Sequence, residues 1–270
     1  MINKYSMKIR DIISESWPGT GPIRYVTIDE FISAAKNANH PHYASIQAAL
    51  FKPNRQIYRG MWSQPNNILA IDIDKTPIRK STNTSNLYTW WIDNISRKWN
   101  DYPKRGKSFI CATDQYTAAG FGSEYLMIPY TQTTIGQCHS EDFWNGFESH
   151  YTANEFNEVV EDLLSQYVDN VNVSTIEGFI SAMAKFDELL PTDEKMKTVF
   201  KLKMQDVSNT YKINDTSLYA AMDSYYDPEY NNFSVKHWPT SFLGSDVEVW
   251  FSSDCYAIPL TMLHEIKESI

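Results

Sequence analysis

The sequence predicts an α+β fold, and three observations lead to this prediction. Short runs rich in β-branched and aromatic residues lie between residues 55 and 140 and return between 240 and 260. Residues 151–226 instead carry apolar residues at the spacing of one helical face. The first 50 residues have helical character as well. We therefore expect a strand-rich core in two parts, with N-terminal helices and a helical insertion.

These patterns divide the chain into four predicted segments. They are an N-terminal helical segment at 1–50, the first half of the core at 51–150, a helical insertion at 151–232 and the second half of the core at 233–270. The N-terminal segment contains a capping box, Thr27-Ile28-Asp29-Glu30, which predicts the start of a helix.

The first half of the core is predicted from β-prone and turn-forming residues. The run Gln56–Gly60 is β-prone and ends in glycine, and residues 65–86, rich in Pro, Asn, Ser and Thr, predict a long loop. The other elements expected here are a helix at Leu87–Trp99, a strand at Ser108–Thr113, a short helix at Thr117–Gly122 and a strand at Tyr125–Pro129.

The insertion is predicted to consist of helices. Apolar residues between Phe156 and Val168 recur three and four positions apart, which is typical of an amphipathic helix. A second capping box, Ser174-Thr175-Ile176-Glu177, precedes another apolar helical face. After the insertion, the strands Val247–Phe251 and Cys255–Leu260 are expected to pair as a hairpin around the turn at Ser252–Asp254.

The composition argues against several classes of function. A formal net charge of −9 disfavours broad binding to duplex nucleic acid, although the basic run Lys104–Lys107 suits the phosphates of a small nucleotide. Three cysteines without CxxC spacing argue against a disulfide framework and a zinc knuckle, and fit a reducing cytoplasm. The N-terminus lacks the apolar stretch of a secretory signal, and no run approaches about 18 apolar residues. We therefore expect a cytoplasmic protein that does not cross a membrane.

Two further motifs suggest a metal site and a thiol nucleophile, but each lacks partner residues that such a site requires. His40-Pro41-His42 is a candidate for binding a metal, yet no third ligand follows at a useful spacing, so no metal is expected. Cys138-His139 with Asp142 suggests a thiol nucleophile, but adjacency in sequence is not the spatial relation that such catalysis requires.

The main candidate site combines three separated segments. Tyr58-Arg59-Gly60 ends a predicted strand, Ser108–Thr113 forms a strand that precedes a helix, and Asp246-Val247-Glu248 begins a late strand. Together they resemble the Arg–Ser–Glu class of ADP-ribosyltransferases, which includes arginine-modifying toxins and phage-encoded enzymes. The resemblance covers about 55–145 and 235–262, and it implies an ADP-ribosyltransferase-like split β-sandwich core.

The resemblance implies a role for each matched residue. In this family an arginine on the first core strand binds the phosphates of NAD, and the next residue offers backbone groups to the nicotinamide amide. A Ser-Thr-Ser strand braces the site, and a late glutamate is catalytic. Carried over, the catalytic set is Glu248, Arg59 and Ser108, and the NAD-binding set is Arg59, Gly60, Ser108, Thr113 and Phe121. Asp246 takes the position associated with acceptor recognition.

This chain departs from the family pattern at two of these positions. The flanking Phe109 aligns Cys111-Ala112-Thr113 with the Ser-Thr-Ser triplet and leaves Ser108 three residues upstream. Whether Ser108 or Thr113 supplies the hydroxyl stays open. The family often has Glu or Gln where this chain has Asp246, so the acceptor stays undefined.

The chemistry of NAD cleavage explains why these residue types are needed. Breaking the bond between nicotinamide and ribose builds positive charge on the ribose, as in glycoside cleavage. A carboxylate such as that of Glu248 stabilises this charge, and an arginine such as Arg59 offers a rigid fork for a pyrophosphate. A neutral hydroxyl orients the carboxylate without neutralising it.

The sequence therefore predicts a mono-ADP-ribosyltransferase that moves ADP-ribose from NAD to a macromolecular acceptor and releases nicotinamide. The acceptor is a protein side chain or a nucleic acid, RNA or DNA. Further hypotheses are a role as a toxin or as an effector in conflict between phage and host, and control by an antitoxin or another regulatory partner. Two alternatives remain open: hydrolysis of NAD alone, and an inactive transferase-fold binding module that acts through its helical insertion.

Overall fold

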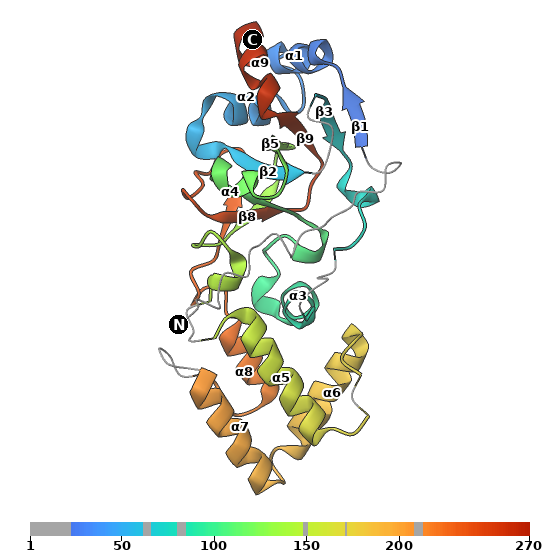
Figure 1. Ribbon diagram of the computed structural model, residues 1–270, viewed down its shortest axis with the longest axis vertical. Helices are drawn as coiled ribbons and strands as arrows, with labels where there is room; N and C mark the ends of the chain where they lie inside the picture. The colour runs from blue at the N-terminus through green and yellow to red at the C-terminus, as the bar shows by residue number, and fades with distance from the viewer. Residues whose placement is uncertain (1–22, 62–65, 80–84, 148–150, 171, 208–212) are drawn as a thin grey trace. The chain divides into compact units, whose positions relative to one another are not determined.

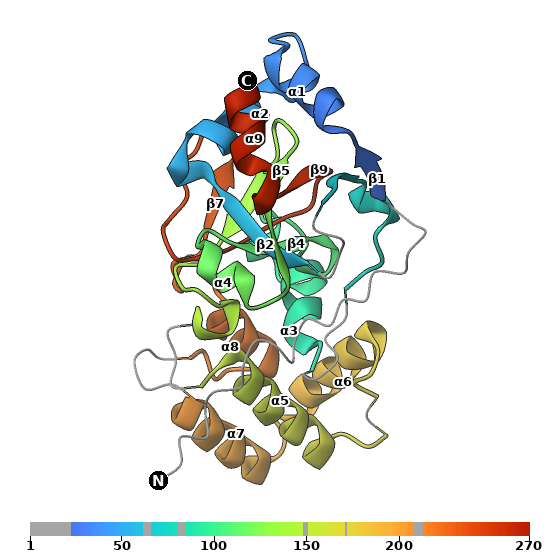
Figure 2. The same cartoon turned by 45° about the horizontal axis from the view of Figure 1, so that its top comes forward.

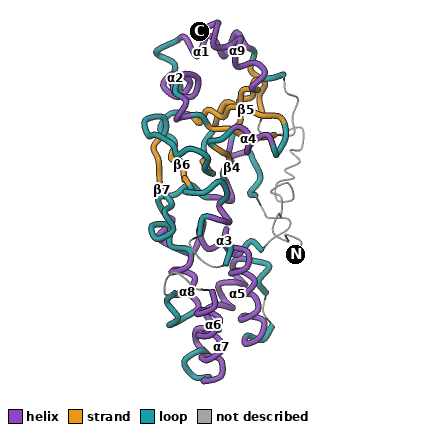
Figure 3. The backbone as a smooth tube through the Cα atoms, turned by 60° about the vertical axis from the view of Figure 1, so that its left-hand side comes forward, coloured by secondary structure: helices purple, strands orange, loops and turns teal. Residues whose placement is uncertain are grey.

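The computed structural model describes residues 23–61, 66–79, 85–147, 151–170, 172–207 and 213–270 (Figure 1). The chain divides into two compact units, the first made of residues 1–83, 101–142 and 234–270 and the second of residues 84–100 and 143–233. Figure 3 shows the strands in the first unit, whereas the second consists of helices and loops.

The first unit contains a sheet of nine described strands in which every pairing is antiparallel. Antiparallel strands with separate helices make this an α+β fold, as the sequence predicts. The order across the sheet is β1-β3-β9-β5-β2-β4-β8-β6-β7. The strands are β1 (Ile23–Val26), β2 (Ile57–Met61), β3 (Ile68–Ile71), β4 (Phe109–Ala112), β5 (Ser123–Pro129), β6 (Thr134–Gln137), β7 (Ser234–His237), β8 (Glu248–Phe251) and β9 (Cys255–Pro259).

Helices accompany the sheet of the first unit. They are α1 (Ile28–Lys36), α2 (Tyr43–Phe51), α4 (Gln115–Ala119) and α9 (Leu263–Ser269), with the short 3-10 turns η2 (Pro53–Arg55), η3 (Ile73–Lys75), η6 (Arg105–Lys107) and η8 (Leu260–Met262). Helix α1 contacts α2 and α9, and α2 contacts β5. The short helix α4 contacts β2, β4 and β5, and Figure 2 shows it beside β2.

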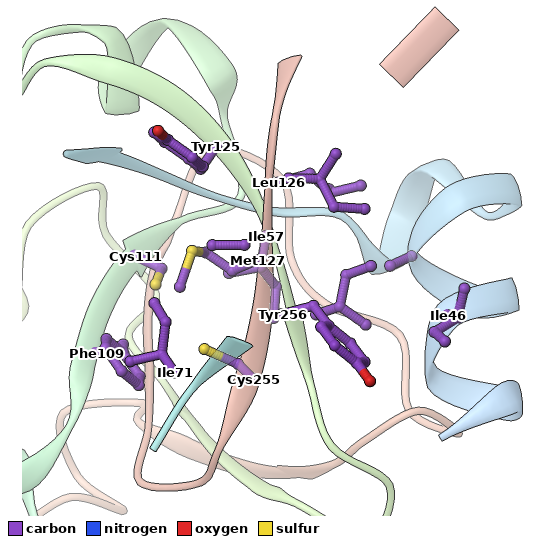
Figure 4. Close-up of a cluster of buried hydrophobic side chains, with 14 of the residues drawn as sticks. Ile46, Ile57, Ile71, Phe109, Cys111, Tyr125, Leu126, Met127, Cys255 and Tyr256 are labelled. Atoms are coloured by element: carbon purple, nitrogen blue, oxygen red, sulfur yellow. The ribbon is translucent and has the colours of Figure 1, made fainter. Parts of the chain in front are cut away.

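The sheet consists of two parts joined at one point. Strands β2 and β4 share a single residue pair, Tyr58 with Ala112, whereas the neighbouring ladders are longer. Burial, and then the nearby Cys111 of β4, raises the pKa of the Cys255 thiol of β9, although β5 and β2 separate the two strands in the sheet order. Both thiols belong to the same buried cluster, which also contains Met127 (Figure 4). The sheet therefore curls so that its two parts share one core.

Because side chains alternate across a strand, the register divides the residues between two faces. The inner face carries Arg59, Cys111, Met127 and Cys255, and the residues paired with them. The outer face carries their sequence neighbours and is packed by α2 near β5, where Figure 4 shows Ile46 beyond Leu126 and Tyr256.

The predicted hairpin between residues 247 and 260 is wrong. Strand β8 pairs with β4 and β6, whereas β9 pairs with β3 and β5, so the two strands belong to different parts of the sheet. The link between them is a corner held by hydrogen bonds to other segments. The backbone N–H of Ile73 donates to the Asp254 carboxylate, and that of Tyr130 donates to the Asp254 carbonyl. These bonds direct β9 away from β8.

Two strands lie where the sequence predicts other structure. Strand β1 lies within the segment predicted to be helical, and β3 lies within the loop predicted at 65–86. Both have four residues, and all four residues of β3 are buried, so β3 shows no alternation that a sequence pattern could detect. The other predicted strands between residues 55 and 130 are confirmed as β2, β4 and β5.

The helix starts follow their capping residues closely. Thr27 caps α1 as predicted, accepting a hydrogen bond from the backbone of Glu30. The second predicted cap is one residue off, because Thr175 rather than Ser174 accepts from the first turn of α6. The predicted helix at Leu87–Trp99 is broken into a short α turn, a π turn and a 3-10 turn.

The second unit is built from helices around an aromatic core. Its elements are α3 (Leu87–Trp90), η4 (Trp91–Ile95), η5 (Arg97–Trp99), η7 (Phe143–Asn145), α5 (Ala153–Tyr167), α6 (Ile176–Leu189), α7 (Glu194–Val207) and α8 (Leu218–Tyr225). Trp99 lies 5.2 Å from Phe233, and Tyr88 lies 5.7 Å from Phe143, as measured between ring centroids. These contacts place residues 84–100 with the helical unit, although the sequence placed them in the first half of the core.

Candidate functional site

The predicted catalytic glutamate begins a strand inside the sheet. Glu248 is the first residue of β8, which lies between β4 and β6. Its backbone N–H donates to the Ser140 carbonyl over 2.8 Å, and its carbonyl accepts from the Cys138 N–H over 2.9 Å. The residue is only 9% exposed. A carboxylate in such a place needs a partner that compensates for its lost hydration.

That partner is Arg105. Its Nη1 atom lies 2.6 Å from Glu248 Oε1, and only 4% of the Arg105 side chain is exposed. Its guanidinium also lies over the ring of Trp250, 5.4 Å from the centroid, on the same strand and face as Glu248. The sequence analysis assigned the basic run Lys104–Lys107 to nucleotide phosphates, because a run of charges gives no sign that one member pairs with a buried carboxylate.

The hydroxyl that braces the glutamate's strand belongs to Thr113. Its Oγ1 accepts from the Val247 N–H over 3.0 Å and lies 3.3 Å from the Val247 carbonyl, which also accepts from the Thr113 N–H over 3.0 Å. Ser108 is at the other end of β4, where its hydroxyl contacts the Lys104 carbonyl and the Ser252 hydroxyl. The structure thus brings Thr113, and not Ser108, to the residue that precedes Glu248.

Arg59 belongs to β2, which β4 separates from the strand of the glutamate in the sheet order. It belongs to the inner face, where it is 5% exposed and lies 6.0 Å from the ring of Phe109. Its Nη1 donates to the Ile110 carbonyl across the point where β2 and β4 meet. Glu248 is on the outer face, because Tyr58 pairs with Ala112 and Ala112 pairs with Glu248. The register therefore assigns Arg59 and Glu248, the two ends of the predicted site, to opposite faces of the sheet.

A row of outer-face residues does connect to Glu248. Tyr58, Ala112 and Glu248 are successive partners across β2, β4 and β8, and Cys138 follows on the far side through its backbone bond to Glu248. The methyl group of Ala112 is the only side chain between the half-buried Tyr58 ring and the carboxylate in this row. Tyr58 is held by its hydroxyl, which donates to Gln56 over 2.7 Å. Neither Tyr58 nor Ala112 has a role of its own in the predicted motifs.

The pKa values of Tyr58 and Cys138, the residues at the two ends of this row, are both raised. Burial, together with the negative charge of Asp114, raises the pKa of Tyr58. Burial, and then the negative charge of Glu248, raises the pKa of the Cys138 thiol to about 12, against the opposing effect of Arg105. A thiol held protonated in this way is a poor nucleophile. The alternative of a Cys138 nucleophile paired with His139 loses support, since His139 is exposed while Cys138 is buried.

Gly60 is the point of closest approach between β2 and α4. A Cβ atom at Gly60 would lie 2.3 Å from the Ala118 carbonyl oxygen and 2.8 Å from Phe121. The predicted NAD-binding residues Gly60 and Phe121 are therefore adjacent, and their backbones are in contact. This close approach leaves no room for a side chain at position 60, which is one physical reason for glycine after the arginine.

Asp246 lies on the surface just before β8. It is exposed and has a positive φ of 54°, a conformation that Asp and Asn adopt more readily than most residues. A single residue, Val247, separates this exposed carboxylate from the buried carboxylate of Glu248 along the chain. Of the two acidic residues in the predicted motif, one therefore faces solvent and the other is packed within the unit.

Other features of the described residues lie apart from Glu248. A cavity of about 300 Å³ is lined by residues of β1 and β3 with Tyr130 and Asp254, and contains none of the predicted site residues. Among the described residues, no group of three or more His, Cys, Asp or Glu side chains is arranged to hold a metal ion. No helix in the described part of the chain is long and apolar enough to span a bilayer.

The chain matches no protein-family model, no curated protein and no solved structure. Function must therefore be argued from the geometry around Glu248. That geometry offers a fixed carboxylate, a guanidinium that contacts it, a braced backbone and a nearby phenol. A fixed carboxylate can stabilise positive charge that develops on a bound molecule.

Proposed function

We propose that the chain is an NAD-dependent ADP-ribosyltransferase in which Glu248 is the catalytic carboxylate. The observation that carries this proposal is the fixation of Glu248. Its backbone is bonded on both sides, its preceding residue is bonded to Thr113, and its carboxylate contacts Arg105. A carboxylate that is already oriented stabilises charge without the cost of reorganising during the reaction.

The reaction that suits this carboxylate is cleavage of a nicotinamide–ribose bond. The bond breaks with positive charge on the ribose, and Glu248 stabilises that charge from one side of the sugar. The electron pair of the bond leaves with nicotinamide, and an acceptor nucleophile then bonds to the ribose carbon. In this proposal the ribose lies over Ala112, with Tyr58 on one side and Glu248 on the other.

The fold supports the same proposal at a coarser level. We propose that the curled, two-part sheet is the split β-sandwich core of this class of transferases, with Gly60 and α4 at its nicotinamide end. The role of Arg59 changes in consequence. It joins β2 to β4 through the Ile110 carbonyl, and we propose that it supports the site through this link.

The exposed Asp246 is the residue proposed to contact the acceptor. The acceptor is a macromolecule, a protein side chain or a nucleic acid. A substitution such as Asp246→Ala is expected to reduce transfer of ADP-ribose while release of nicotinamide continues. The same comparison separates transfer from hydrolysis of NAD alone, which releases nicotinamide without labelling an acceptor.

The test is incubation of the purified chain with NAD labelled in its adenylate part, with and without cell lysate. We expect release of nicotinamide and a labelled acceptor, both reduced by roughly 10²–10³-fold in Glu248→Gln. Glu30→Gln is the control for loss of a carboxylate that has a cationic partner, because Glu30 pairs with Arg24 and is not part of the proposed site. No nicotinamide release by the wild-type chain at high protein concentration would refute the proposal and favour an inactive binding module.

A further inference from the structure

The contact between Arg105 and Glu248 is a buried ion pair. Both side chains are close to fully buried, at 4% and 11% exposure. Buried ion pairs add little net stability, because the loss of hydration offsets much of the attraction between the charges. Removing one partner is nevertheless harmful, since it leaves the other charge uncompensated. Orientation of the carboxylate is therefore a stronger reason for this pair than stability.

Arg105 is itself held in place by Trp250. The guanidinium lies over the indole ring, and the indole Nε1 donates to the Pro103 carbonyl over 3.0 Å. The ring also fills the space left by Gly136, where a Cβ atom would lie 2.2 Å from it. Since Trp250 is two residues from Glu248 on one strand, the same backbone carries the carboxylate and the surface that fixes its partner.

The segment that carries Arg105 is fixed without help from the ion pair. The Arg79 N–H donates to the Gly106 carbonyl over 2.7 Å, and the Lys107 ammonium donates to the carbonyls of Asp74 and Thr76. The Ser108 hydroxyl donates to the Lys104 carbonyl over 2.7 Å. A substitution at Arg105 therefore leaves three bonds that tie the segment to residues 74–79 and one bond within it.

We propose that Arg105 is a positioning residue that orients the Glu248 carboxylate for the reaction. This inference rests on the proposed function. Arg105 holds one oxygen of the Glu248 carboxylate in a defined position. The carboxylate is therefore already oriented toward the ribose when NAD binds. Arg105 contacts Glu248 and not NAD in this proposal. Its loss is expected to lower kcat for nicotinamide release by about 10²-fold, the effect of displacing a reacting group by about 1 Å, with KM for NAD little changed.

The test compares Arg105→Gln and Arg105→Lys with the wild-type chain, by kcat and KM for nicotinamide release and by thermal unfolding. Arg105→Lys keeps the charge but loses the planar group that stacks on Trp250, so we expect an intermediate kcat. Arg24→Gln is the control for loss of a cation, because Arg24 is an exposed residue paired with Glu30. Added guanidinium ion is expected to restore part of the kcat of Arg105→Ala.

The outcomes separate this inference from the proposed function. If the wild-type chain releases no nicotinamide, both the proposed function and the role of Arg105 are refuted. An active wild-type chain whose Arg105→Gln variant stays within about threefold in kcat, or gains activity, refutes only the role of Arg105. If Arg105→Gln does not fold, Arg105→Lys decides: an unchanged kcat, or a loss that appears entirely in KM, overturns the inference.

Discussion

Arg59 and Glu248, the two ends of the predicted site, lie on opposite faces of one sheet. The pairing of Tyr58 with Ala112 and of Ala112 with Glu248 fixes this relationship, because neighbouring residues on a strand point to opposite faces. Arg59 donates to the Ile110 carbonyl from the inner face, whereas Glu248 contacts Arg105 on the outer face. The two residues are therefore expected to respond to substitution in different ways.

Arg59→Ala is expected to lower stability more than it weakens NAD binding. It removes a buried donor at the single point where β2 and β4 meet, and we expect the free energy of unfolding to fall by about 2–3 kcal/mol. The measurement is chemical unfolding, together with KM for NAD in the folded fraction. Arg55→Ala is the control, because Arg55 donates to the Thr240 carbonyl near the surface. A large rise in KM with unchanged stability would show that Arg59 binds NAD after all.

The hydroxyls of Thr113 and Ser108 are expected to differ in importance. Thr113→Val removes the acceptor of the Val247 N–H and should cost about 1–3 kcal/mol of stability, with a fall in kcat for nicotinamide release. Ser108→Ala removes a hydroxyl at the distant end of β4 and should leave kcat unchanged. Equal effects of the two substitutions on kcat would contradict the assignment of the bracing role to Thr113.

Gly60→Ala is expected to displace α4 from β2. The added methyl group would lie 2.3 Å from the Ala118 carbonyl, and overpacking of this kind costs about 1–3 kcal/mol. Gly120→Ala is the matched control at the end of the same helix, since its nearest neighbour would be 3.4 Å away and its φ of −63° suits alanine. Thermal unfolding of both variants checks the prediction, and similar melting temperatures would count against close packing at Gly60.

Because of the Cys138 thiol, the free energy of unfolding is expected to depend on pH in the alkaline range. Its pKa is raised in the folded chain from the ordinary value of 9.0 to about 12, mainly by burial. The folded state therefore favours the protonated thiol. Its contribution to the free energy of unfolding is complete below the ordinary pKa of 9.0 and is lost as the pH rises toward about 12. In Cys138→Ala, the free energy of unfolding should fall less steeply above about pH 9. An identical slope in both proteins would contradict this account.

Most of the individual helices and strands could be predicted from the sequence. Thr27 marks the start of α1, the apolar spacing from Phe156 marks α5, and the strand before Thr113 appears as β4. These features depend on residues within a few positions of one another, and so they can be recognised in a window of sequence. The short buried strand at Ile68–Ile71 was missed because all of its residues are buried and no alternation remains.

The candidate site depends on strand pairing and side-chain contacts between residues far apart in the sequence, which no local sequence pattern predicts. The sequence by itself determined the α+β class, the helical segment, and the acidic and glycine residues at positions 246, 248 and 60. The tertiary structure decided that β8 and β9 do not pair, that Arg105 contacts Glu248, and that Thr113 braces its strand. The physical reason is that register between distant strands sets which face each side chain occupies, and a shift of one residue reverses that face.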